Sequence, residues 1–246
     1  MTELHTGTDK LLGRVHGPVA VLSFNRPESR NALSDEIYDG FNTALPQVAQ
    51  RDDIRVLMVT GEGGAFCSGG DVKGFRASHA GEGESMTPEE SLDRLRRNQM
   101  WISGAFRKLP KPVVAAIPGP AAGAGFSIAL AADFRVATES AIFVSAFSTI
   151  GASGDFGSSW FLPRLIGEAK AKEFMFLRLG SLRVRLSTLV SLTACLLMPS
   201  LMTLQWLSAT NLQHAHRSLC ACRRKISSVH SMPMLLPHST PKQPPW

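Results

Sequence analysis

Two glycine-rich turns in this sequence could direct backbone N–H groups at a common point. The first turn, residues 61–71, follows the apolar segment 56–60, and the second, residues 118–125, follows the apolar segment 113–117. Because each turn lies between a strand-like segment and a helix-like segment, its N–H groups should face a cleft. Two N–H donors directed at one oxygen form an oxyanion hole, which stabilises negative charge on a carbonyl oxygen.

Other chemistry at these turns is less well supported. Gly119, Gly123 and Gly125 are spaced G-x-x-x-G-x-G, whereas a dinucleotide-binding turn needs G-x-G-x-x-G, and no Gly-Lys-Ser/Thr sequence of a phosphate-binding loop occurs. Cys67 lies in the first turn, but no histidine is near it in the sequence to activate it as a nucleophile. No residues have the spacing of metal ligands, so we expect no metal site.

The elements that must position the turns alternate between strands and helices. Expected strands are two within residues 11–26, separated at Gly17-Pro18, and others at 56–60, 113–117, 134–137 and 141–144. Expected helices begin after Ser34 and at the Thr87 capping box, the latter running to about residue 108, and others cover 126–131, 157–165 and 168–176. This ββα rhythm predicts an α/β fold with helices covering sheets, and the polar, glycine-rich segment 76–85 is expected to be mobile.

Four stretches make the chain resemble the crotonase (enoyl-CoA hydratase/isomerase) superfamily. They are residues 25–33, 66–71, 111–117 and 119–133, in that order, and the resemblance extends over about residues 11–177. It implies a crotonase-like spiral of ββα units that binds an acyl-coenzyme A. Coenzyme A would then be part of the substrate, so no separate cofactor is implied.

The resemblance also implies which residues form the site. The backbone N–H groups of Ser68 and Ala124 would form the oxyanion hole. Ala124 replaces the glycine that is usual in the family, and its N–H remains usable if its φ angle is negative. Residues implied to contact the substrate or its coenzyme A are Arg26, Arg30, Ala32, Ser68, Gly69, Gly70, Asp71 and Phe147. The two arginines could pair with phosphates or could equally be solvated surface charges.

Departures from the family pattern bear on the reaction. The two glutamates of family hydratases match Ser127 and Phe147 here, so the usual water-adding mechanism is disfavoured. Asp155 is similar in position to the single aspartate of other members, which include enoyl-CoA isomerases and a dehalogenating branch. Phe147, Phe156 and Trp160 would raise its pKa and make it a better base. Because Asp155 precedes a predicted helix, the structural alternative is an N-cap.

Charge divides the chain near residue 176. Residues 174–246 contain eight of the 26 Lys and Arg residues and none of the 20 acids, so they account for the net charge of +6. We therefore expect a crotonase-like core at 1–177 and an atypical basic tail at 178–246, either disordered or read in a shifted frame. A membrane-spanning segment within 186–207 is disfavoured by its serines, threonines and Pro199.

These features predict an acyl-CoA substrate and neither a nucleic acid nor a membrane as partner, since the basic cluster 223–225 lacks a nucleic-acid-binding motif. Four scattered cysteines and a polar N-terminus favour a cytoplasmic location. The resemblance implies a homotrimer or hexamer, which the atypical tail calls into question. The sequence favours enoyl-CoA isomerisation through an enolate, and the alternative is a catalytically silent or defective acyl-CoA-binding relative.

Overall fold

The computed structural model describes residues 2–70, 86–149, 151–177 and 194–195. The strands are β1 (Thr2–Glu3), β2 (Leu11–His16), β3 (Val19–Phe24), β4 (Val56–Gly61), β5 (Val113–Ile117), β6 (Ala121–Ala122), β7 (Phe134–Ala137), β8 (Phe143–Val144) and β9 (Ala194–Cys195). The α-helices are α1 (Asp35–Gln50), α3 (Pro88–Gln99), α4 (Ala105–Lys108), α5 (Ala124–Ala131), α6 (Ser158–Ile166) and α7 (Glu168–Phe176). Shorter helical turns are η1 (Pro27–Ser29), the π-helical η2 (Met100–Gly104) and η3 (Phe147–Thr149).

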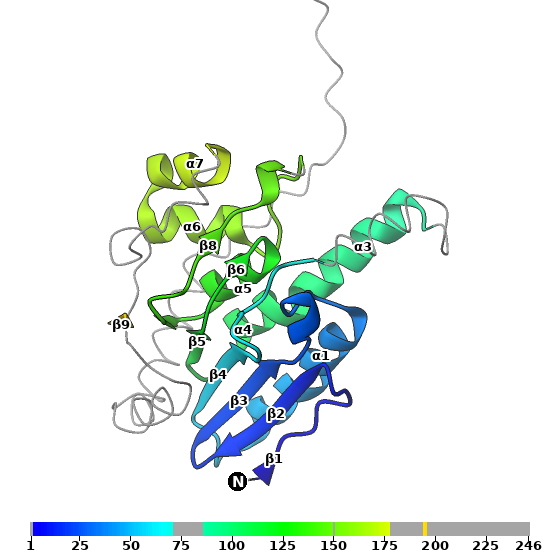
Figure 1. The fold of residues 1–246 in the computed structure, drawn as a ribbon. Helices are drawn as coiled ribbons and strands as arrows, with labels where there is room; N and C mark the ends of the chain where they lie inside the picture. The colour runs from blue at the N-terminus through cyan, green and yellow to red at the C-terminus, as the bar shows by residue number, and fades with distance from the viewer. Residues whose placement is uncertain (1, 71–85, 150, 178–193, 196–246) are drawn as a thin grey trace, which may run out of the picture.

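In the described residues, seven strands form one sheet in the order β1-β2-β3-β4-β5-β7-β9, and β6 pairs with β8 in a second, two-stranded sheet (Figure 1). The strands β3, β4, β5 and β7 are parallel neighbours. Because the carboxyl ends of parallel strands lie at one edge of a sheet, the turns that follow β4 and β5 leave from the same edge.

The central strands are apolar on both faces, as parallel strands between two layers usually are. Ala20 and Leu22 of β3 pack in a large cluster with α1 and α5, while Val19 and Val21 of the same strand pack on the opposite face with Met58. All six residues of β3 are buried, and their side chains alternate between two packed faces, so a slip by one residue against β4 would exchange two sets of side chains that fit different neighbours.

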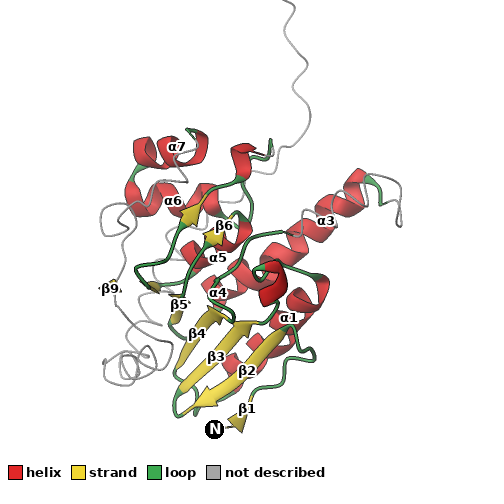
Figure 2. Cartoon of the chain, in the orientation of Figure 1, coloured by secondary structure: helices red, strands yellow, loops and turns green. Residues whose placement is uncertain are grey.

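The helices form a connected layer next to the sheet. Helix α1 packs against β2 and η2, α5 packs against η2 and α6, and α6 packs against α7. Figure 2 shows α3 extending away from the strands, with α5, α6 and α7 grouped on the other side of the molecule. No helix within the described ranges is both long enough and apolar enough to cross a membrane.

Most predicted elements are confirmed, and the differences have identifiable causes. The predicted helix from Thr87 does begin with a capping box and does reach Lys108, but the π turn η2 interrupts it. The predicted strand 141–144 shortens to β8, which pairs with the unpredicted β6. Pairing between two such short strands depends on contacts between distant residues, which local sequence patterns do not report. The expected mobile segment 76–85 and all of the expected tail except residues 194–195 lie outside the described residues.

The packing of α5 against the first turn leaves no room for a side chain at Gly125. A Cβ atom there would lie 2.2 Å from the carbonyl oxygen of Cys67 and 2.7 Å from the Cys67 Cβ. We expect Gly125→Ala to destabilise the fold by about 2–4 kcal/mol, because backbone cannot move aside as a flexible side chain can. Urea denaturation measures this, with exposed Asn42→Ala on α1 as the control. Equal stability of the two variants would refute the close contact.

Candidate functional site

The two glycine-rich turns lie side by side at the carboxyl edge of the sheet. The N–H of Phe66 donates to the carbonyl oxygen of Pro120 at 3.0 Å, and the N–H of Ala122 donates to the carbonyl oxygen of Cys67 at 2.9 Å. These bonds connect the turn after β4 to the turn after β5 as a short parallel bridge. The sequence-based expectation that the two turns face one place therefore has a structural basis.

Gly69 brings the first turn against the start of α5. A Cβ atom at Gly69 would lie 2.9 Å from the Ala122 carbonyl oxygen and 3.2 Å from the backbone nitrogen of Ala124, and Gly69 has a φ of +96°. Only glycine combines this approach with this conformation at low cost. Ala124 does not have a positive φ, so it meets the condition set for its N–H. It is the first residue of α5, and N–H groups in the first turn of a helix have no acceptor within the helix.

The backbone N–H of Ser68 has a partner in the structure. It donates to the carbonyl oxygen of Arg30 at 3.0 Å, and the Ser68 hydroxyl donates to the carbonyl oxygen of Ser29 at 3.1 Å. For Ser68 to serve as the second oxyanion donor, an acyl oxygen would have to share or replace the Arg30 carbonyl. The role of Ser68 as an oxyanion donor thus remains a prediction.

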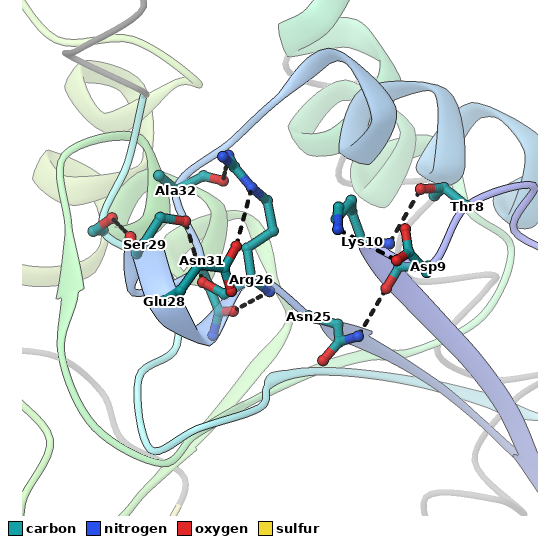
Figure 3. Close-up of polar contacts among 10 residues, drawn as sticks. Thr8, Asp9, Lys10, Asn25, Arg26, Glu28, Ser29, Asn31 and Ala32 are labelled. Atoms are coloured by element: carbon teal, nitrogen blue, oxygen red, sulfur yellow. Dashed lines mark hydrogen bonds and ion pairs between the residues drawn. The ribbon is translucent and has the colours of Figure 1, made fainter.

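A buried amide holds the 26–33 loop against the first turn. The Asn31 side-chain nitrogen donates to the carbonyl oxygens of Glu62 at 2.9 Å and Ala65 at 2.8 Å. Its side-chain oxygen accepts the Arg26 N–H at 2.8 Å, and Figure 3 shows Asn31 beside Arg26. Asn31 is fully buried and has a left-handed φ of 59°. Asparagine tolerates that conformation better than most side chains, so it can both turn the chain and tie it down.

The two arginines predicted to meet coenzyme A differ in their surroundings. The Arg26 guanidinium donates to the carbonyl oxygen of Ala32 at 2.8 Å and lies 3.9 Å from the Glu28 carboxylate, as Figure 3 shows. Arg26 therefore helps to hold its own loop. Arg30 is exposed beside the first turn, where a solvated cation remains accessible to a phosphate.

Of the other residues implied to line coenzyme A, Ala32 and the glycines of the first turn lie in adjacent segments. The Leu33 N–H donates to the Gly69 carbonyl oxygen at 2.8 Å, and Leu33 also bridges to Gly70. These contacts bring the loop that contains Ala32 beside the first turn. Asp71 lies outside the described residues.

Asp155 lies partly buried in the segment that precedes α6. Burial raises the pKa of its carboxyl group from 3.8 to about 6. Its Oδ1 atom is buried with no hydrogen-bond partner among the described residues. The N-cap residue of α6 is Gly157, and no side chain caps that helix, so Asp155 does not act as the N-cap. A carboxyl group of this kind ionises near neutral pH and keeps an acceptor atom unused.

The predicted apolar neighbours are only partly as expected. Phe147 and Phe156 are buried, and a Cβ atom at Gly154, beside Asp155, would lie 3.8 Å from the Phe147 ring. Trp160 is 38% exposed, with the Arg164 guanidinium 4.0 Å above its ring. The desolvation of Asp155 therefore owes more to the two phenylalanines than to the tryptophan.

The pKa of Cys67, in the first turn, responds to the charge of Asp155. Burial raises the pKa of the Cys67 thiol to about 12, and the negative charge of Asp155 adds to this. Tyr38 of α1 also has a raised pKa, mainly through burial and then through Cys67 and Asp155. A thiol that stays neutral at physiological pH is a poor nucleophile, which agrees with the lack of a nearby histidine in the sequence to activate Cys67.

The positions of the two hydratase glutamates hold no acid. Ser127 is fully buried, and its hydroxyl donates to the carbonyl oxygen of Gly123 at 3.2 Å, within the first turn of α5. Phe147 is buried in the core. Within the described ranges, no group of three or more His, Cys, Asp or Glu residues could hold a metal ion.

Backbone strain marks the same region independently of any resemblance. Among the described residues, the non-glycine residues with positive φ are Arg30, Asn31, Ala146 and Phe156. Arg30 and Asn31 adjoin the first turn, Ala146 faces Gly123, and Phe156 follows Asp155. Residues held in such conformations tend to cluster at functional sites. Sequence reasoning missed this signal, and it also missed Tyr38 and Gln99, which contact Phe156.

Solved structures share this arrangement of sheet, turns and helices, which defines the crotonase fold. The chain is similar to an enoyl-CoA hydratase from Polaromonas sp. JS666, with a TM-score of 0.77, 34% identity and coverage of 90% of this chain and 84% of that one. It is also similar to a putative enoyl-CoA hydratase/isomerase from Mycobacterium abscessus, with a TM-score of 0.78, 25% identity and coverage of 91% and 85%.

The enoyl-CoA hydratase/isomerase family model matches residues 14–181, so the chain belongs to this family. It is 39% identical over 163 residues to a 1,2-epoxyphenylacetyl-CoA isomerase of Escherichia coli, a match that covers 65% of this chain and 60% of that protein. It is 40% identical over 153 residues to a probable enoyl-CoA hydratase of Rhodobacter capsulatus, covering 62% and 55%. The matched part thus spans less than two thirds of the length of these relatives.

The Asn31 amide provides a test of the loop's attachment. Asn31→Asp keeps the size and the tolerance for left-handed φ but replaces the donor nitrogen with an oxygen facing two carbonyl oxygens. We expect a loss of about 2–5 kcal/mol in the free energy of unfolding, because two buried acceptors lose their partner. Asn25→Asp, which removes one exposed bond to Asp9, should cost less than about 1 kcal/mol. Equal losses measured by urea denaturation would contradict this role.

The raised pKa of Asp155 makes stability depend on pH. The folded protein holds this proton more tightly than the unfolded chain, so stability falls as pH rises from about 4 to about 6. We expect Asp155→Asn to be more stable than the wild type by about 2–3 kcal/mol at pH 8, with most of the gain lost at pH 4. Denaturation at both pH values measures this, with exposed Asp39→Asn as control. A gain independent of pH would show that the carboxyl is not desolvated.

Proposed function

We propose that the chain catalyses proton transfer at carbon atoms of an acyl-CoA thioester, and specifically double-bond isomerisation through an enolate. The observation that carries the proposal is Asp155: a desolvated carboxyl group with a pKa of about 6 and a buried oxygen atom that has no hydrogen-bond partner among the described residues. A base with a pKa near the working pH is well matched to taking up and returning a proton.

The proposed reaction has two steps. The Asp155 carboxylate takes a proton from the α-carbon of a 3-enoyl-CoA, and the electrons of the broken C–H bond pass into the thioester and the adjacent double bond. The Ala124 N–H, joined by that of Ser68, would stabilise the enolate oxygen. The protonated carboxyl then returns the proton at the γ-carbon, which moves the double bond into conjugation with the thioester and restores the carboxylate. The γ-to-α direction uses the same groups in reverse.

The names of the relatives are compatible with isomerisation and also with hydration. The relative from Escherichia coli is named as an isomerase, whereas the one from Rhodobacter capsulatus is named as a probable hydratase. The two-glutamate hydratase mechanism lacks both of its carboxylates here, because their positions hold Ser127 and Phe147. Isomerisation needs one carboxyl group, and Asp155 supplies it.

The proposal extends to partners. The substrate would carry coenzyme A covalently, so no separate cofactor is needed. A homotrimer or hexamer, a cytoplasmic location and the absence of nucleic-acid binding remain predictions from the sequence.

Arg30 is the better candidate of the two arginines for a phosphate of coenzyme A, because Arg26 already bonds within its loop.

Substitution of Asp155 tests the mechanism. We expect Asp155→Asn to lower kcat on a 3-enoyl-CoA by about 10²–10⁴-fold, because the amide cannot accept the proton. Formation of the conjugated 2-enoyl-CoA, followed by its absorbance, measures kcat. Asp39→Asn provides a matched control on the exposed side of α1. In the wild type, kcat/KM should rise with pH through about 6, as the carboxyl ionises. Near-full activity of Asp155→Asn would end the assignment.

A second candidate, a catalytically silent acyl-CoA binder, is favoured by one observation: the Ser68 N–H is already bonded to the Arg30 carbonyl oxygen. Exchange of the α-protons of butyryl-CoA with D₂O distinguishes an active enzyme from a silent binder, since exchange needs both the base and a polarised thioester. Exchange that disappears in Asp155→Asn supports the enzyme. Calorimetric binding of butyryl-CoA without exchange supports the silent binder.

A further inference from the structure

We propose that Gln99 is a positioning residue for Asp155, which it orients by holding the next backbone N–H in the chain. The inference rests on the proposed function, because it assigns to Gln99 the task of orienting the proposed base.

The contact that carries the inference joins two parts of the chain that are 57 positions apart. The backbone N–H of Phe156 donates to the side-chain oxygen of Gln99 at 3.1 Å. Phe156 directly follows Asp155, so this bond holds the peptide group that links the two residues. A displacement of that peptide would move the Asp155 Cα and redirect its carboxyl group.

The peptide needs an external restraint because its neighbourhood is conformationally permissive. Phe156 has a φ of 47°, which is unfavourable for an aromatic residue, and Gly154 and Gly157 have φ values of 97° and 83°. Two glycines that flank the pair Asp155-Phe156 allow the segment to relax into other conformations. Within the segment, the Ser158 N–H holds the Asp155 carbonyl oxygen, and a bond from outside the segment would add to that restraint.

The Asp155 side chain also lacks an obvious anchor of its own. Its Oδ1 atom has no hydrogen-bond partner among the described residues, and no side chain caps α6. The carboxyl group interacts with its own backbone N–H, so its orientation follows the main chain, and Gln99 bonds that main chain at the next residue. The unused carboxyl oxygen stays available to a substrate because the restraint acts on the main chain.

A second contact acts on the same residue from another helix. The Tyr38 ring of α1 stacks on the Phe156 ring, with 6.2 Å between centroids and 12° between planes. Phe156 is thus held through its ring by α1 and through its N–H by the end of α3. The stack restrains the side chain, whereas two hydrogen bonds restrain the peptide itself: Gln99 accepts from its N–H, and the Ser158 N–H donates to its carbonyl oxygen, that of Asp155, at 3.0 Å.

The local helix geometry accounts for the placement of Gln99. It is the last residue of α3, directly before the π turn η2. An insertion of this kind changes the direction of side chains relative to an uninterrupted α-helix, and π turns are frequent at functional sites. Because η2 packs against both α1 and α5, the end of α3 is fixed relative to the two helices that flank the turns.

Two substitutions at Gln99 separate positioning from packing. Gln99→Met keeps the length of the side chain and removes the acceptor, so we expect kcat for α-proton exchange or isomerisation to fall by about 10–100-fold with KM changed less than about threefold. Gln99→Glu keeps an acceptor, so its kcat at pH 8 should lie within about threefold of the wild type. Gln47→Met is the control, since Gln47 also bonds backbone atoms, but on the exposed side of α1.

The pH profile gives a readout that a packing role would not move. A carboxylate at position 99 lies next to Asp155 and should raise its pKa, which shifts the acid limb of kcat/KM upward from about pH 6. The other titratable groups that couple to this cluster are Tyr38 on α1 and Cys67 in the first turn, both with raised pKa values, and Arg94 on α3, which acts on Tyr38. The same groups are present in the wild type and in both variants.

The outcomes are distinct. A Gln99→Met variant as active as Gln47→Met, a Gln99→Glu variant as slow as Gln99→Met at pH 8, or an acid limb unchanged in Gln99→Glu would each overturn the proposal. Should Gln99→Met fail to fold by circular dichroism, the rate and acid limb of Gln99→Glu decide. Full activity of Asp155→Asn would refute the proposed function instead, and a Gln99→Met variant equal to the wild type beside an inactive Asp155→Asn would refute only the role of Gln99.

Discussion

The candidate site depends on main chain packing against main chain at two positions that have no Cβ atom. Gly125 of α5 lies against the Cys67 backbone, and Gly69 lies against Ala122 and the backbone nitrogen of Ala124. A side chain at either glycine would force the two turns apart. Parallel pairing of β4 with β5 brings the turns to one edge of the sheet, but the glycines set the final distance between them. The buried Asn31 amide then joins the third segment, the 26–33 loop, to the same place.

Strain and its compensation occur together around this contact. Asn31 has an unfavourable φ, and three hydrogen bonds of its side chain hold it there. Phe156 is similarly strained, and it has a hydrogen bond from outside its own segment and a stacked ring. Asp155 adds a further cost, since a desolvated carboxyl with an unpaired oxygen destabilises the ionised folded state. Such costs persist where the surrounding structure is stable enough to bear them, which the large apolar core provides.

Much of this architecture could be predicted from the sequence, because the relevant signals are local. The bounds of β5, β7 and α7, the Thr87 capping box and the adjacency of the two turns follow from apolar periodicity, capping residues and glycine placement. The strand β6, the π turn η2 and the Gln99–Phe156 bond could not be predicted, since each depends on contacts between distant residues. Asn31 belongs to a recognisable motif, but its sequence context does not reveal that it bonds Glu62 and Ala65. The partner of the Ser68 N–H was likewise visible only in the folded chain.

The Asn31 amide makes all three of its bonds to backbone atoms, at Arg26, Glu62 and Ala65. The bonds between the two turns also join backbone to backbone. The backbone frame of the site therefore does not depend on the identity of most side chains that project from it, provided that Gly69, Gly125 and the Asn31 amide remain. Side chains around the acyl group can be exchanged to suit differently shaped substrates while the donor geometry stays the same. A scaffold built in this way is well suited to redesign of its specificity.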